Sequence, residues 1–448
     1  MADFSRKKVI CIKKDIISEL PGNINEKILG LLPVQDAVRT SILSKRWRRE
    51  WTMIPNLIFN DQFLDIMKDK LSQYPDPELK ALKFVSVINE VLLLHNGSIV
   101  NFSLKFLRGC DSSVIHHYID QWIPVFARNS IKQLSLEDWR RGEFTAHHFS
   151  SLDLTHLRLI SFWFPYTSAS GGFTYLTNLE LIEVAISKQC IFDCPVLEKL
   201  TLVVCNGLSH TNFFAPKLKC LQQMCDQVSL AGFENLGPQN LTEFSCSLCY
   251  RCALQPTVTV SLVKIFHSLN KIEKIYIAGE FTRYLAAGGS PNKLSQPLPY
   301  LKTLDISQIF FDELDMISCL LCLIRSAPNL CKLNISAEVP IQVVYDDDLE
   351  NFLVKDIEGF SMDRLEIVTF SNFIGFRAEL KLVKFLLAHA PLLKTMSIHR
   401  SDYVTKDFAL VIAEEMLQYA RASSRAQIRY LEQPVAINVF ESFKDLYV

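Results

Sequence analysis

The sequence LKTLDI at residues 301–306 has an apolar residue at its first, fourth and sixth positions, and this pattern recurs through most of the chain. Of the 36 pattern positions in twelve such segments, 35 are apolar and only Gln223 is not. The segments start 21 to 35 residues apart, which predicts a solenoid of stacked units. They begin at Ile99, Ile131, Leu154, Leu176, Leu197, Leu218, Leu241, Ile272, Leu301, Leu330, Leu365 and Leu393.

Each of these segments predicts one strand. Two apolar residues two positions apart point to the same face of a strand, so stacked segments predict a parallel sheet with one buried face. Spacings of 21 to 23 residues leave room only for a turn or a loop between strands, whereas spacings near 30 admit a full helix. We expect such a helix at residues 312–327, where Met316, Leu320, Leu323 and Ile324 share one face.

A different, helical pattern precedes the repeats, at residues 15–54. Three apolar series have i, i+4 spacing: Ile24, Ile28 and Leu32; then Val34, Val38 and Ile42; then Trp47 and Trp51. Pro21 and Pro33 punctuate the first two series, and Ser44 is the expected N-cap of the third helix. About 40 residues cannot build a self-sufficient core. The surplus apolar residues Leu29, Leu31, Leu43, Met53 and Ile54 must therefore be covered by the rest of the chain or by a partner protein.

The same stretch resembles the plant-type F-box. The resemblance lies in the runs DIISELP at 15–21, IL at 28–29, LP at 32–33, DAVRTS at 36–41 and LSKRWR at 43–48. Gly22 and Gly30 stand where the family more often has Asp and Ser. The resemblance implies binding to a Skp-type adaptor, which is joined to a cullin carrying a RING protein and a ubiquitin-conjugating enzyme. Carried over by position, the adaptor-facing residues are Leu20, Pro21, Ile24, Ile28, Leu29, Val38, Leu43 and Trp47.

The repeats resemble the irregular leucine-rich repeats that follow a plant F-box, and residues 362 to about 440 resemble the FBD region of the same family. The second resemblance lies in LEIVTF at 365–370, a helical pattern at 379–389, APLLK at 390–394 and a helical run at 407–419. Trp122 and Ile123, before the second predicted strand, also fit the family. We interpret the FBD-like region as terminal repeats that cap the array.

These patterns together predict an α/β fold class, with a short three-helix F-box followed by an irregular leucine-rich-repeat solenoid that has a parallel inner sheet. We expect a basic tail at 1–14, the F-box at 15–60 and a helical linker joining it to the repeats at 61–98. Leucine-rich repeats are expected at 99–361, and FBD-like terminal repeats with a cap at 362–448.

The inner face of the predicted sheet is the expected site for a protein target. Residues between and beside the last two pattern positions of each strand point away from the core, and curved solenoids present such a surface to partners. The charges there are mixed, so no substrate of a single sign is implied, and the alternative is that many of these side chains are merely solvated. The target-binding candidates are His156, Arg158, Glu180, Lys199, Lys274, Tyr276 and Asp305.

Composition excludes several other classes of protein. Lys plus Arg total 47 against 48 Asp plus Glu, a balance of 47 − 48 = −1, so no nucleic acid is expected as a partner. No apolar run approaches the ~20 residues that a membrane span needs, and residues 1–10 lack the apolar core of a secretory signal. We therefore expect the cytoplasm, the nucleus or both, with the 13 Cys present as thiols.

One cysteine cluster offers an alternative chemistry. Cys246, Cys249 and Cys252 have thiolate spacing compatible with zinc, and Cys220 and Cys225 lie one repeat earlier. Cys246 is itself a pattern position facing the core, so buried thiols are the favoured interpretation. The chain also lacks G-x-S-x-G, P-loop and dinucleotide-binding motifs, so no catalytic residue, metal or cofactor is expected.

The resemblance and the residues lead to one main hypothesis. The chain is expected to be the non-catalytic substrate-recognition subunit of a Skp-cullin-F-box ubiquitin ligase, which holds an unknown protein target near charged ubiquitin. One alternative is an interaction scaffold whose F-box does not lead to ubiquitin transfer. Another is a metal- or thiol-dependent enzyme that uses the cysteine-rich units.

Overall fold

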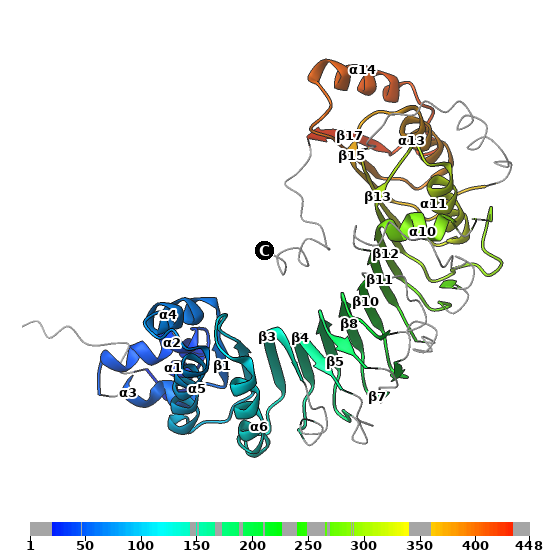
Figure 1. Ribbon diagram of the computed structural model, residues 1–448. Coiled ribbons are helices and arrows are strands. Elements are labelled where there is room, and N and C mark those ends of the chain that lie inside the picture. Colours follow the sequence, from blue (N-terminus) through cyan, green and yellow to red (C-terminus); the bar gives the residue numbers. More distant parts are fainter. Residues whose placement is uncertain are drawn as a thin grey trace, which may run out of the picture. The chain divides into compact units, whose positions relative to one another are not determined.

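A computed structural model describes most of the chain, and it divides the chain into two compact units, Met1–Leu176 and Thr177–Val448. In each unit, parallel strands pack against helices or short outer strands (Figure 1). The described residues are 20–45, 47–143, 149, 152–165, 173–187, 191–208, 211–225, 240–248, 265–266, 269–287, 289, 291–339 and 360–432.

The first unit begins with the three predicted helices, two of which end in a 3-10 turn. They are α1 (Gly22–Leu29), α2 (Val34–Arg39) with η1 (Thr40–Ile42), and α3 (Trp47–Glu50) with η2 (Trp51–Met53). The expected N-cap is present, because the Trp47 N–H donates to Ser44 Oγ at 3.3 Å. The change to 3-10 geometry was not expected. It moves Ile42 out of the apolar series of α2, since side chains repeat every three residues there rather than every 3.6.

The parallel strands of the first unit start earlier than the sequence pattern suggested. Their order is β1 (Asn56–Phe59), β2 (Asn101–Lys105), β3 (Gln133–Glu143) and β4 (His156–Phe164). The prediction began the array at Ile99, but Ile54, Leu57 and Phe59 follow the same spacing and are buried. The last residues of the helical module are therefore also the first repeat of the solenoid.

Three longer helices cover the buried face of these strands. They are α4 (Asp61–Leu71), α5 (Pro77–Leu94) and α6 (Ser112–Arg128), with Asn60, Asp76 and Asp111 as their N-caps. Two of these helices are tied together by Trp122 Nε1, which donates to Asn89 Oδ1 at 2.6 Å. The region 61–98 is thus packed into the first unit through α4 and α5.

Within the described residues, ten strands of the second unit pair in parallel in the main sheet, and the buried positions of the first nine follow the predicted pattern. Even Gln223, the one polar residue at a pattern position, is buried in β10. The tenth strand, at residues 427–432, was not predicted and has no buried residue. The strands are β5 (Asn178–Ile182), β8 (Lys199–Val203), β10 (Cys220–Cys225), β11 (Glu243–Leu248), β12 (Lys274–Gly279), β13 (Thr303–Ile309), β14 (Lys332–Ala337), β15 (Ile367–Phe373), β16 (Thr395–Arg400) and β17 (Gln427–Glu432). The short β6 (Ala185–Ile186) follows β5.

The elements that connect successive strands of the second unit depend on the spacing between those strands. Where the spacing is long, helices fill it: α10 (Glu280–Ala287), α11 (Leu314–Ser326), α13 (Arg377–His389) and α14 (Lys406–Leu417). The helix expected at 312–327 is therefore confirmed as α11. Where the spacing is short, a second small sheet forms from β7 (Ile191–Asp193) and β9 (Asn212–Phe214), with Phe192 stacked on Phe213 at 4.8 Å. Only a turn or loop had been expected there.

Five strands share one backbone feature at the same position, within the strand or directly after it. The residue five positions after the start of the strand has a φ between 51° and 59°, which is the left-handed region that non-glycine residues rarely adopt. These residues are Ser161, Glu183, Val204, Gln308 and Asn372. Asn adopts this conformation readily, whereas a β-branched residue is strained in it. Val204 is therefore the residue of the five that fits its backbone least well.

We expect Val204→Asn to stabilise the second unit by about 1 kcal/mol, because it relieves strain of the order found for left-handed L-residues. Val204 is half-buried, so the substitution removes little packing. Hydrogen exchange of the β8 amides measures the change. Val203→Asn is the control, because Val203 is buried in the strand and its replacement should destabilise the protein. Equal destabilisation by both variants would contradict the prediction.

Candidate functional surfaces

The helical module exposes an unusual number of large apolar side chains. Leu31 and Ile42 are the most exposed, at 86% and 85%. Leu31 lies in the turn after α1 and Ile42 in η1, and the exposed apolar residues of this module, which we call the N-terminal apolar surface, are carried by these helices and the turns that follow them. Exposed apolar groups gathered on one small element are typical of a protein-binding site. The surface consists of Pro21, Ile24, Ile28, Leu31, Leu32, Ile42 and Leu43.

The eight residues predicted to face an adaptor do not lie in equivalent places. Pro21, Ile24, Ile28 and Leu43 are exposed, and Leu20 and Val38 are half-buried. The side chains of Leu29 and Trp47 are 0% and 3% exposed, so they form the core of the module. In this structure their contribution to any partner surface is to hold the helices in place.

Leu31, Leu32 and Ile42 are exposed members of the N-terminal apolar surface that were absent from the predicted adaptor-facing set, and Leu31 and Ile42 are the most exposed. Leu31 was recognised only as surplus apolar content, because it lies outside the i, i+4 series. Ile42 was assigned to the buried stripe of α2, and the 3-10 turn turns it outward. The signal that could have identified Leu31 is its position between Gly30 and Pro33, where the chain leaves one helix and enters the next.

The module also buries a polar side chain without satisfying it. Asn25 in α1 is fully buried, and within the described part of the chain neither its Oδ1 nor its Nδ2 has a hydrogen-bond partner. An unsatisfied buried amide costs about 1–3 kcal/mol relative to one that is paired. Asn25 therefore lowers the stability of the helices that carry the N-terminal apolar surface.

We expect Asn25→Leu, a change that nearly preserves shape, to stabilise the first unit by about 1–2 kcal/mol. Urea unfolding followed by tryptophan fluorescence measures this, since all five Trp lie within residues 1–176. Glu26→Leu is the matched control on the same helix, because Glu26 is exposed and its replacement should change stability by less than about 0.5 kcal/mol. A loss of stability on Asn25→Leu would show that the amide has a partner in solution.

In the first unit, two of the predicted target-binding residues lie on β4. His156 and Arg158 alternate with the buried Leu157 and Leu159, so they point to the face opposite the core. Both are half-buried, and Nδ1 of His156 lies 2.9 Å from Oγ1 of Thr155. The predicted orientation of these two side chains is therefore found.

In the second unit, the other five candidates occupy two rows across the sheet. The register aligns Lys199, Cys220, Glu243 and Lys274 in one row, and Nζ of Lys274 is 3.8 Å from Oε2 of Glu243. Glu180 on β5 is in register with Thr201 of the second row. The first row thus carries both positive and negative side chains across neighbouring strands.

In the second row, side chains of neighbouring strands form hydrogen bonds with one another. Tyr276, Asp305 and Asn334 are neighbours in register, and Asn334 Nδ2 donates to Asp305 Oδ2 at 3.0 Å. Burial raises the pKa of Asp305 above its ordinary value, against the effects of Asn334 and Lys332. Burial, and then the charges of Glu243 and Asp305, raise the pKa of Tyr276. This row offers hydrogen-bond donors and acceptors beside charged groups, which suits recognition of a polar protein surface.

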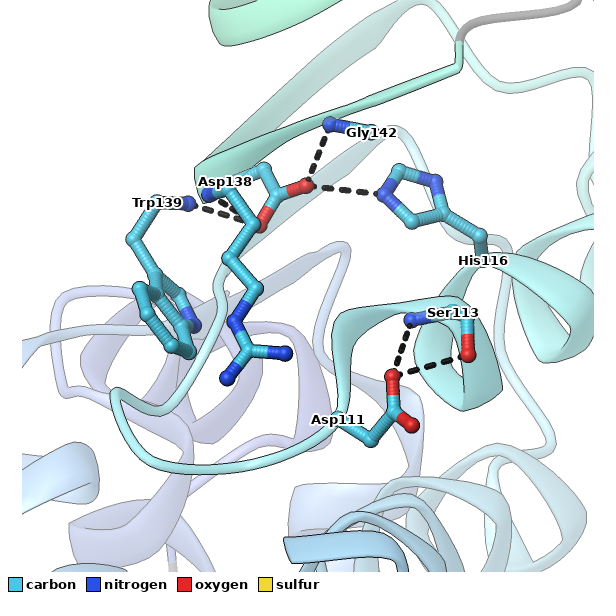
Figure 2. A network of polar contacts seen from close by, with 7 residues as sticks. Asp111, Ser113, His116, Asp138, Trp139 and Gly142 are labelled. Carbon is cyan, nitrogen blue, oxygen red and sulfur yellow. Dashed lines mark hydrogen bonds and ion pairs between the residues drawn. The ribbon is translucent and has the colours of Figure 1, made fainter.

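A network of short hydrogen bonds around Asp138 stabilises the first unit. Figure 2 shows the Asp138 carboxylate accepting from Nε2 of His116 at 2.9 Å and from the backbone N–H groups of Trp139 and Gly142 at 2.6 and 2.8 Å. It also accepts from the Arg140 N–H at 3.1 Å. Burial alone would raise the pKa of Asp138, but these hydrogen bonds outweigh it and leave the pKa below its ordinary value.

This network closes an irregularity in β3. The pairing of β3 with β4 shifts between Glu137 and Gly142, and the Asp138 carboxylate satisfies the amide groups that the shift releases. A Cβ on Gly142 would lie 1.7 Å from Nε2 of His116, so only glycine fits there. Asp138 and His116 are thus committed to holding the strand.

The metal alternative has no support in the described residues. No group of three or more His, Cys, Asp or Glu side chains there could hold a metal ion. Cys246 is buried, and burial raises the pKa of the Cys220 thiol to about 11, which keeps it protonated. Cys249, Cys252 and the side chain of Cys225 lie outside the described residues. Stoichiometric zinc in the purified protein would revive this alternative.

No helix within the described ranges is both long enough and apolar enough to cross a membrane.

Comparisons with known proteins match three regions of the chain. A model of the F-box domain matches residues 17–59, and a model of the FBD matches residues 362–398. Between them, residues 119–335 match a model described as "FBD-associated F-box protein At5g56370, LRR repeats".

Relatives from Arabidopsis thaliana match over nearly the full length. The F-box/FBD/LRR-repeat protein At1g13570 is 31% identical over 432 residues, which cover 93% of this chain and 99% of the relative. The putative F-box/FBD/LRR-repeat protein At4g03220 is 26% identical, covering 94% of this chain and 96% of its own length. The putative F-box/FBD/LRR-repeat protein At2g05300 is 24% identical, covering 93% and 97%.

Proposed function

The chain belongs to the F-box/FBD/LRR-repeat family, and from this membership we propose that it is the substrate-recognition subunit of a Skp-cullin-F-box ubiquitin ligase. F-box domains generally bind Skp-type adaptors. The observation that carries the proposal is the N-terminal apolar surface, whose side chains are left uncovered by the described part of the chain. Covering exposed apolar side chains with a partner removes them from water, which is favourable.

In this proposal the protein supplies binding rather than chemistry. The adaptor covers the N-terminal apolar surface, and a target binds the inner faces of the sheets. The target lysines are then held near ubiquitin carried by another subunit, which raises their effective concentration. The target-binding residues of the proposal are His156, Arg158, Glu180, Lys199, Lys274, Tyr276 and Asp305, and the proposed boundary between the leucine-rich repeats and the FBD-like region is at residue 361.

Co-expression with a Skp-type adaptor and a cullin tests the first step. The full-length chain should co-purify with the adaptor at equal stoichiometry and should recruit the cullin only when the adaptor is present. A monomeric chain that ignores the adaptor would overturn the proposal.

Proximity labelling with the proteasome blocked tests the second step. Lys274→Glu with Tyr276→Ala should remove a specific set of labelled proteins, because both side chains lie on the inner face. The control is Lys293→Glu, an exposed lysine in the segment before β13. Captured proteins whose half-lives do not change when the chain is removed would favour the interaction scaffold instead.

A further inference from the structure

A second apolar surface lies at the end of helix α5, and three of its four residues lie outside residues 17–59, the region matched by the F-box model. Leu93 is 83% exposed, and Leu94, Met53 and Val100 are also exposed; we call these four residues the linker apolar surface. Residues 91–100, VLLLHNGSIV, contain no Asp, Glu, Lys or Arg. Burial lowers the pKa of His95, so its ring is neutral at pH 7. Exposed segments of this length normally carry charges.

Hydrogen bonds hold this segment directly against the last turn of the F-box helices. The carbonyl of Thr52 accepts from the N–H groups of Asn96 and Gly97 at 2.9 and 3.0 Å. Nε2 of His95 lies 2.8 Å from the carbonyl oxygen of Ile54. A Cβ on Gly97 would lie only 2.8 Å from Cα of Met53, so the absence of a side chain permits this close approach.

The same turn connects the linker apolar surface to the N-terminal apolar surface. The carbonyl of Pro55 accepts from the Val100 N–H at 2.8 Å, which places Val100 beside it. On its other side, a Cβ on Gly30 would lie 4.0 Å from Cδ of Pro55. Leu31 and Leu32, which belong to the N-terminal apolar surface, follow Gly30 directly. Gly30 and Val100 therefore both lie beside Pro55.

We propose that the Skp-type adaptor binds both surfaces, so that its footprint extends from Met53 past the F-box onto Leu93, Leu94 and Val100. This inference rests on the proposed function. The adaptor is the occupant because the two surfaces are continuous through η2: residues 96–100 are hydrogen-bonded to residues 52–55, and η2 packs against α1, which carries part of the N-terminal apolar surface. A protein that covers Leu31 and Leu32 approaches Met53 as well. Covering these side chains adds apolar burial at the edge of the interface, where one partner replaces water over both elements.

Adaptor affinity of the purified full-length chain tests this. Leu93→Asp with Leu94→Asp should weaken binding by about 10-fold or more, because two apolar contacts are lost and two carboxylates must be desolvated. The matched control is Leu79→Asp with Leu82→Asp, on the same helix and also exposed, which should change affinity by less than about 2-fold. Tryptophan fluorescence during urea unfolding establishes that both variants keep the stability of the first unit. The milder Leu93→Ser replaces the double variant if it does not.

The outcomes separate this inference from the proposed function. If the unmodified chain does not bind the adaptor, the proposed function fails. If it binds and the Leu93/Leu94 variant binds equally well, the inference is overturned while the proposed function stands. Light scattering and target capture are measured on the same samples. A variant that keeps adaptor affinity but loses self-association would assign the surface to a second copy, and one that loses only target capture would assign it to the target; either result overturns the inference.

Discussion

Leu31→Asp combined with Ile42→Asp is expected to abolish binding of the Skp-type adaptor while the chain stays folded. Both side chains are almost fully exposed, so a carboxylate at either position meets water in the free protein. In the complex, each aspartate would replace an apolar contact worth about 1.5–3 kcal/mol and would have to be desolvated. A combined loss of about 4 kcal/mol corresponds to roughly a thousandfold weaker binding. Isothermal titration calorimetry with the purified adaptor measures the change.

The matched control for this variant lies in the second unit. Tyr300→Asp with Leu392→Asp replaces two large side chains that are also exposed and introduces the same charge. It should leave adaptor affinity unchanged, which separates the position of the charges from their number. Full adaptor binding by the Leu31/Ile42 variant would mean that the adaptor uses another surface.

Asp138→Ala should cost the first unit about 3–5 kcal/mol, the largest stability change that we expect from one polar substitution. The carboxylate is completely buried and accepts from three backbone N–H groups as well as from His116. Its removal leaves these donors buried without partners, and each unsatisfied group costs about 1–3 kcal/mol before the strand relaxes. Urea unfolding followed by tryptophan fluorescence reports on this unit alone, because all five Trp are in it.

A nearby acidic residue provides the control for Asp138. Asp153 is 57% exposed and lies 3.9 Å from Lys132 Nζ, so Asp153→Ala should change stability by less than about 1 kcal/mol. If both substitutions had the same small effect, the network around Asp138 would not be holding β3.

The pH dependence of unfolding should carry the same signature. The pKa of Asp138 is lower in the folded protein than in the unfolded chain, because hydrogen bonds to the carboxylate outweigh its burial. The stabilisation is therefore complete above the unfolded pKa and is lost as the pH falls through the lower, folded value. The stability difference between the natural chain and Asp138→Asn should accordingly shrink below about pH 4. A difference that grows on acidification would contradict this assignment.

The sequence predicted the architecture well because the solenoid is built from local rules. Most strands of the main sheet could be predicted from three apolar positions at fixed spacing. The helix at 314–326 could be predicted from the long spacing between two such strands. Ile54, Leu57 and Phe59 follow the repeat pattern, but the first repeat was missed because these residues had been assigned to the F-box. The outer strands β7 and β9 were missed because their three residues are too short for a periodic signal.

The candidate surfaces were less predictable than the fold. Leu29 is buried and Leu31, two positions later, is exposed. Which of the two is buried depends on how α1 packs against η2. Ile42 required knowledge that α2 tightens into a 3-10 turn. The partnership of His116 with Asp138 joins residues 22 positions apart on a helix and a strand, so no local pattern contains it. The exposure of Leu93 and Leu94 likewise depends on which face of α5 packs inward.

The shared role of residues 54–59 has a practical consequence for dominant-negative alleles. Removing the F-box is a common way to separate target capture from degradation, and the match to the F-box model ends at residue 59. A deletion at that point would also take away β1, leaving the edge of β2 unpaired and the ring of Phe102 without its neighbour Phe59. Such a shortened polypeptide would score as loss of function through aggregation, and a phenotype assigned to missing adaptor contact would in fact report a broken end of the repeat array.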